Sequence, residues 1–156
     1  MNWKQLKDIQ RALDLSIMEP RGLIYEDTLF DRIMAGVVEL GEVANEVRHF
    51  KFWSTKGPSS REVILEELVD VLHFVLSLMN IAGETPRDVM PYKRESLNMQ
   101  FLQMIAQLIN FRPGDSQALA ATFMGLAAIL GFEDAEIEEA YMKKNEVNYQ
   151  RQKEGY

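Results

Sequence analysis

Two pairs of acidic residues have the type and the spacing that metal binding requires. Glu39 and Glu42 form one pair, Glu67 and Asp70 form the other, and each pair has the spacing i, i+3 in a segment with helical periodicity. Residues three apart lie on one face of a helix, so their charges repel unless a cation lies between them. Two such pairs on facing helices would form a cage of oxygen ligands suited to Mg²⁺ or Mn²⁺. Divalent ions held in this way commonly bind the phosphates of a nucleotide.

The second pair lies in an unusually apolar segment. Residues 63–79 read VILEELVDVLHFVLSLM, which predicts a central helix that is buried on most sides. Glu67, Asp70, His73 and Ser77 follow one line along it, and a buried carboxylate must be paired, protonated or bound to a metal. We expect His73 to be a satisfied core histidine; the alternative is a partner that orients Asp70.

The acids also have a simpler interpretation, as solvated residues of ordinary amphipathic helices. A single pair would favour that interpretation, but two pairs on consecutive helices favour a metal site. Gly41 lies inside the first pair, where the missing side chain would allow a neighbouring helix or a ligand to approach.

Basic and amide residues near the C-terminus have the chemistry to bind phosphate. Lys144, Asn148 and Arg151 recur at about one-turn spacing and would share one face of a helix. Lys and Arg bind phosphate oxygens, and Asn can bind phosphate, metal-bound water or a sugar hydroxyl. A solvated basic tail is the alternative.

Composition limits the functional class. The chain has 156 residues, of which 47% are hydrophobic, and we predict one domain over residues 1–156. The net charge of −7 argues against nucleic-acid binding, and the absence of cysteine excludes disulfides, thiolate metal sites and a cysteine nucleophile. The charged N-terminus does not resemble a signal peptide, and the longest apolar run, 71–82, is too short to cross a bilayer. We therefore predict a cytoplasmic protein with no membrane partner.

Apolar periodicity predicts an all-α fold. The expected helices cover residues 3–18, 28–52, 60–81, 95–110, 116–130 and 133 to beyond 148, with Thr28 or Asp27 capping the second. This pattern predicts a single-domain bundle of about six helices. The third helix is apolar on most sides, more than a monomer of this size would cover. We therefore predict a homodimer with a large apolar interface.

The spacing of the acids resembles a known signature. Glu39-x-x-Glu42 followed, after 24 residues, by Glu67-x-x-Asp70 resembles the all-α nucleoside triphosphate pyrophosphatases, which include MazG-like proteins and dimeric dUTPases. Residues 39–54, ELGEVANEVRHFKFWS, resemble the dUTPase branch in their acid-pair helix and Phe-Lys-x-Trp element. The C-terminal segment resembles a motif of the same branch: Tyr141-x-x-Lys144-Asn145-x-x-Asn148-x-x-Arg151-Gln152-x-x-Gly155-Tyr156. The segment Gln10-x-x-Leu13-Asp14-x-x-Ile17 resembles its base-recognition helix.

The resemblance implies a dimeric, MazG-like enzyme that hydrolyses dUTP to dUMP and pyrophosphate with more than one Mg²⁺, or Mn²⁺, at each site. It assigns Glu39, Glu42, Glu67 and Asp70 as metal ligands, with Glu42 or Glu39 also activating the attacking water. It assigns phosphate binding to Lys144, Asn145, Asn148 and Arg151, and base binding to Gln10 and Asp14. Lys51 and Trp53 would reach the active site of the partner subunit.

Two other functions remain open from the sequence. One is a less specific, house-cleaning (d)NTP pyrophosphatase of MazG type. The other is a non-catalytic helical interaction module whose acids are only solvated.

Overall fold

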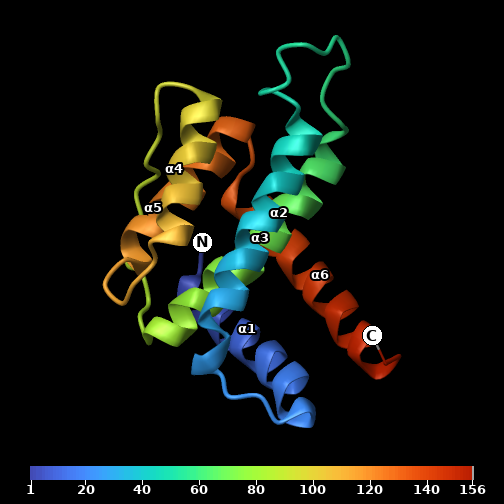
Figure 1. The fold of residues 1–156 in the computed structure, drawn as a ribbon, viewed down its shortest axis with the longest axis vertical. Helices are drawn as coiled ribbons and strands as arrows, with labels where there is room; N and C mark the ends of the chain where they lie inside the picture. The colour runs from blue at the N-terminus through green and yellow to red at the C-terminus, as the bar shows by residue number, and fades with distance from the viewer. Residues whose placement is uncertain (156) are drawn as a thin grey trace.

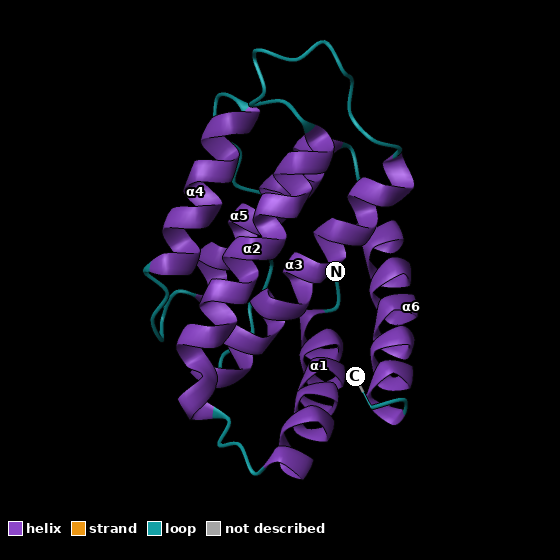
Figure 2. Cartoon of the chain, turned by 45° about the vertical axis from the view of Figure 1, so that its right-hand side comes forward, coloured by secondary structure: helices purple, strands orange, loops and turns teal. Residues whose placement is uncertain are grey.

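The computed structural model describes residues 1–155 as an all-α fold, in which this part of the chain contains six α-helices and no β-strand (Figures 1 and 2). The helices are α1 (Trp3–Met18), α2 (Leu29–Val47), α3 (Arg61–Ala82), α4 (Leu97–Ile109), α5 (Ser116–Leu130) and α6 (Asp134–Lys153). Two short 3₁₀ turns, Glu19–Arg21 and Glu26–Thr28, connect α1 to α2. The predicted fold class is confirmed.

Helix α3 is the centre of the bundle. It packs against α1, α2, α5 and α6, and its side chains from Leu68 to Met79 are almost all buried. The α2–α3 pair lies between α4 and α5 on one side and α1 and α6 on the other (Figure 1). All six helices contribute to one hydrophobic core, as the apolar composition of residues 63–79 led us to expect.

Helix α2 is shorter than predicted. It ends at Val47 because Arg48 adopts a left-handed backbone conformation with φ of 62°. The Arg48 guanidinium then binds the loop that follows, donating to Ser54 Oγ at 2.9 Å and to the Lys56 carbonyl at 3.2 Å. Residues 48–52 therefore belong to the loop between α2 and α3.

The caps of α2 and α3 differ. The Ser60 side chain caps α3 by accepting from the Val63 amide. Thr28 stands at the N-cap of α2 but forms no capping bond, because its hydroxyl donates to the Tyr25 carbonyl and accepts from Arg32 Nε. A 3₁₀ turn thus replaces the predicted cap of α2.

One face of the α2–α4 surface is apolar and exposed. Phe30, Met34 and Val38 recur every four residues along α2 and are 79%, 63% and 47% exposed. Leu102 and Ile109 are exposed on the neighbouring α4.

Within residues 1–155, no single helix has both the length and the apolar character that crossing a membrane requires; only the bent pair α5–α6 passes by length and composition together.

Candidate metal and nucleotide site

Three of the four predicted metal ligands converge. The antiparallel packing of α2 and α3 brings Glu39 beside Glu67 and Asp70, and one carboxylate oxygen from each lies within 4.8 Å of the other two. Oxygens that share one Mg²⁺ at about 2.1 Å lie up to about 4.2 Å apart, so a small contraction would place these three around one ion. The side chains are half-buried, which leaves open positions for water or substrate.

The electrostatics of the three acids favour a bound cation. Burial, followed by the charges of Asp70 and Glu67, raises the pKa of Glu39. Burial and the charge of Asp70 raise the pKa of Glu67. Burial also raises the pKa of Asp70, although a hydrogen bond from Lys144 opposes it. Each carboxylate is therefore harder to ionise here than in water, and a divalent ion would remove that penalty.

Glu42 lies at the rim of the cluster. It is exposed and outside the three-carboxylate group, although its charge helps to raise the pKa values of Glu39 and Glu67. Its predicted roles as a metal ligand and as the group that activates water remain predictions.

Lys144 from α6 closes one side of the cluster. Its Nζ lies 2.7 Å from Asp70 Oδ2 and 3.0 Å from Glu66 Oε1. Burial disfavours the charged form of Lys144, but the hydrogen bonds to Asp70 and Glu66 outweigh it and raise the pKa of the lysine. Sequence reasoning missed Glu66, because its partner is 78 residues away and no local spacing reveals such a contact.

The other predicted phosphate ligands divide between two faces of α6. Asn148 is half-buried and Arg151 is exposed, on the same face as Lys144. The hydrogen bond from Lys144 lowers the pKa of Glu66, and the charge of Arg151 adds to this effect. Asn145 is instead buried, and its side-chain amide interacts with the Tyr141 hydroxyl. Tyr156, at the end of the C-terminal motif, lies outside the described residues.

The predicted base-binding residues are buried in a polar network between α1, α3 and α6. Gln10 Nε2 donates to Asp14 Oδ1 at 2.8 Å, and Gln10 Oε1 accepts from the Tyr141 hydroxyl at 2.9 Å. Asp14 also pairs with Arg32 at 2.8 Å, and both side chains are more than nine-tenths buried. The two predicted residues lie together, but the protein itself already engages their polar atoms.

His73 belongs to the same network. Its side chain is buried, as predicted for a core histidine, and its Nδ1 lies 2.6 Å from Gln10 Oε1. Its ring packs on Tyr141 with 4.6 Å between centroids, and burial lowers the pKa of His73 to about 3. Nε2, however, has no hydrogen-bond partner within residues 1–155, so the predicted satisfaction of this histidine is wrong at one atom.

The loop between α2 and α3 carries an exposed aromatic cluster. Trp53 packs edge-to-face on Phe50 and on Phe52, and is 66% exposed. Lys51 Nζ lies 5.4 Å from the centre of the Phe50 ring. In this chain alone the cluster is left on the surface, so the contribution of Trp53 and Lys51 to a partner subunit remains a prediction.

Two cavities differ in their distance along the helices from the acid cluster. A cavity of about 260 Å³ is lined by Asp14, Arg32, Ala35 and Phe74, among others. Ala35 and Phe74 each lie one helical turn from a carboxylate of the cluster, Glu39 and Asp70 respectively. The cavity therefore borders the polar network at Asp14 and Arg32, and Glu39, Glu67 and Asp70 do not line it.

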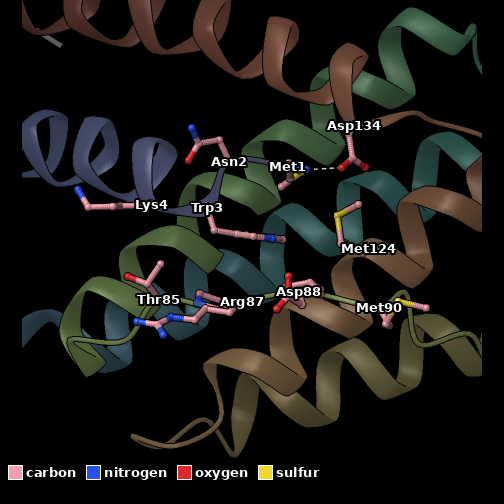
Figure 3. Close-up of a pocket in the computed structure, with 12 residues that line it drawn as sticks. Met1, Asn2, Trp3, Lys4, Thr85, Arg87, Asp88, Met90, Met124 and Asp134 are labelled. Carbon is pink, nitrogen blue, oxygen red and sulfur yellow. Dashed lines mark hydrogen bonds and ion pairs between the residues drawn. The ribbon is translucent and has the colours of Figure 1, made fainter.

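The larger cavity, of about 750 Å³, lies elsewhere, between the start of α1, residues 85–90 and the start of α6 (Figure 3). Trp3 and Lys4 form part of one wall, and Met124 and Asp134 lie across from the loop residues. None of its described lining residues is a predicted metal ligand, so its volume does not identify it as the reactive site.

Comparison with known proteins adds a family assignment. The model of a family described as dUTPase matches residues 2–156, which is nearly the whole chain. No curated protein matches the chain.

Proposed function

Because the chain belongs to the dUTPase family, we propose that it hydrolyses dUTP to dUMP and pyrophosphate at the Glu39–Glu67–Asp70 cluster, with Mg²⁺ as the metal. The family provides the activity, and the convergence of three carboxylates within 4.8 Å carries the assignment of the site. Three clustered carboxylates, of which Asp70 pairs with Lys144, give an excess of negative charge that supports the binding of a cation.

Bound Mg²⁺, or Mn²⁺, would neutralise charge on the triphosphate and lower the pKa of the attacking water. Glu39, Glu67 and Asp70 would hold the first ion. Glu42, at the solvent-facing rim, would complete the site for a further ion. Its carboxylate, or that of Glu39, would also orient the attacking water and accept its proton.

The face of α6 that carries Lys144 would bind the phosphates. Lys144 now pairs with Asp70, and a cation bound by Asp70 would compete for the same oxygen. Glu66 would then keep the ammonium beside the cluster, where it can stabilise charge on the departing pyrophosphate. Asn148 and Arg151 lie along the same face and would extend this phosphate site.

We also propose that a second copy of the chain covers the apolar stripe of Phe30, Met34 and Val38. Three large apolar side chains in a row on one helix, next to exposed apolar residues of α4, are unusual on a monomer surface. The partner's Trp53 loop could then reach the site.

The dimer proposal can be tested with two methionine variants. Met34→Glu should shift the protein from dimer to monomer in light scattering coupled to gel filtration. Met90→Glu, at an exposed methionine on the loop before α4, is the control and should remain dimeric. A monomeric wild-type protein would contradict this proposal.

Selectivity decides between the proposed function and a less specific pyrophosphatase. Purified protein with Mg²⁺ should release dUMP and pyrophosphate from dUTP much faster than it hydrolyses dCTP, dTTP or dATP, as measured by product chromatography. Comparable rates on dCTP or dTTP would instead support the house-cleaning (d)NTP pyrophosphatase.

A further inference from the structure

The buried network between α1 and α3 has a fixed direction of hydrogen bonding, which begins at Asp14. Asp14 Oδ2 accepts from the Tyr25 hydroxyl at 2.5 Å, the Ser77 hydroxyl at 2.7 Å and Arg32 Nη1 at 2.8 Å. An ionised carboxylate can only accept hydrogen bonds. Every group that faces Asp14 must therefore present a donor.

Gln10 is oriented by this requirement. The amide group of a glutamine has one donor end and one acceptor end, and its NH₂ must face Asp14 Oδ1 at 2.8 Å. Its carbonyl oxygen must then face away from Asp14. That oxygen accepts from the Tyr141 hydroxyl at 2.9 Å and lies 2.6 Å from His73 Nδ1.

The orientation of Gln10 determines the tautomer of His73. Because an amide oxygen cannot donate, His73 Nδ1 must carry the hydrogen. A neutral imidazole with Nδ1–H has a lone pair at Nε2, and this nitrogen is buried without a partner within residues 1–155. The ring is neutral at physiological pH because burial lowers its pKa to about 3.

We infer that Asp14 is a positioning residue for substrate selectivity, which acts through Gln10 to hold His73 Nε2 as an acceptor for the pyrimidine base. The inference rests on the proposed function. Uracil presents a donor at N3, which would bind this nitrogen, whereas cytosine presents a lone pair at N3, which would face the lone pair of Nε2. Gln10 therefore acts on the base through His73, since its own polar atoms are all engaged.

The surroundings of His73 agree with this assignment. His73 lies one turn from Asp70 on α3, so a base at Nε2 would be close to phosphates at the metal cluster. Asn145 is also buried, and its side-chain amide interacts with the hydroxyl of Tyr141, whose ring packs on His73. Because His73 Nε2 is buried, the proposal requires the surrounding helices to open locally when the base binds.

The tautomer can be measured without any activity assay. The chain has two histidines, so long-range ¹H–¹⁵N correlation spectra resolve both rings, and a His49→Gln variant assigns them. We expect His73 to be neutral with Nδ1–H between about pH 5 and pH 8, and its Nε2 resonance to shift on adding dUMP but not dCMP. A wild-type spectrum with Nε2–H, or equal shifts with both nucleotides, would overturn the inference.

Two variants of the network separate orientation from packing. Asp14→Asn replaces an acceptor with an amide that can also donate, so Gln10 can turn and both His73 tautomers can form. The ratio of kcat/KM for dUTP to that for dCTP should fall roughly tenfold to a hundredfold. Tyr25→Phe removes another bond to the same carboxylate oxygen but leaves Asp14 an acceptor, so its ratio should stay near that of wild type.

The outcomes distinguish the inference from the proposed function. If Asp14→Asn and Tyr25→Phe change the ratio equally, Asp14 is only structural and the inference fails. If wild-type protein does not hydrolyse dUTP, the proposed function fails, while the spectra still report the tautomer. If Asp14→Asn does not fold, the wild-type spectra with dUMP and dCMP decide.

Discussion

Two polar sites of this protein are the buried Gln100 amide and the Glu39–Glu67–Asp70 cluster. They differ in how completely the chain supplies partners for their polar and charged groups. Gln100 on α4 is fully buried, and its Nε2 donates to the carbonyls of Tyr92 and Thr122, each at 2.9 Å. Its Oε1 accepts from the Arg94 amide at 2.7 Å. The site is neutral, every polar atom of the amide has a partner, and its effect is to hold residues 92–94 against α4 and α5.

The acid cluster is the opposite case. Glu39, Glu67 and Asp70 place three carboxylates within 4.8 Å of one another, and burial raises the pKa of each. Lys144 pairs with only one of them, Asp70. A buried polar group that serves the fold is satisfied by the fold, whereas the proposed function requires a cation from solution to satisfy this cluster.

The largest expected effect is on catalysis. Glu67→Gln removes a ligand charge at nearly constant shape, so dUTP hydrolysis should fall by at least about a hundredfold, while metal-free stability should be unchanged or higher. Glu62→Gln, at an exposed acid five residues earlier on α3, is the control and should retain activity. Steady-state kinetics at saturating Mg²⁺ measure both variants. Full activity in Glu67→Gln would mean that the cluster is not the metal site.

At the Gln100 site, a disruptive substitution should lower the stability of the fold. A Cβ added at Gly125 would lie 1.8 Å from the Tyr92 carbonyl oxygen, so Gly125→Ala must push residues 92–94 away from α5. We expect a loss of about 3 kcal/mol in the free energy of unfolding, measured with urea.

Gly41→Ala is the matched control for Gly125→Ala. No described atom lies within 4 Å of a Cβ at Gly41, so the added methyl group has space, and the change should stabilise α2 by about 0.5–1 kcal/mol. If Gly125→Ala were as stable as wild type, the close contact between Gly125 and Tyr92 would not contribute to the stability of the fold.

The smallest effect is a dependence of stability on pH. The raised pKa of Glu39 means that the folded state binds its proton more tightly than the unfolded state. Above the folded-state pKa, ionisation of Glu39 therefore lowers the free energy of unfolding. This loss of stability shrinks as the pH falls below the folded-state pKa, and it is gone below the ordinary pKa of a glutamate, about 4.3. In EDTA, Glu39→Gln should melt above wild type at pH 7, and the gap should narrow as pH falls. A constant gap would contradict a raised pKa at Glu39.

The sequence predicted the features that have local periodicity. Apolar spacing identified all six helices, and the i, i+3 acids identified the three carboxylates that converge. The end of α2 was missed because it depends on bonds from Arg48 to a loop that has no periodic pattern of its own.

Contacts between distant segments left no signal in the sequence. Lys144 pairs with Glu66 across 78 residues, and Gln100 binds Thr122 across 22 residues. His73 Nδ1 contacts Gln10 Oε1 across 63 residues. The type of each residue was visible, but its partners depend on how α1, α3, α4, α5 and α6 pack together.

Pyrophosphate release from dUTP, measured with and without Mg²⁺ on the same wild-type preparation, tests most directly whether the unbalanced acids form a metal site for hydrolysis. We predict rapid release with Mg²⁺ and a loss of release in EDTA that added Mg²⁺ restores. Equal release in EDTA, or none with either Mg²⁺ or Mn²⁺, would contradict the assignment of Glu39, Glu67 and Asp70.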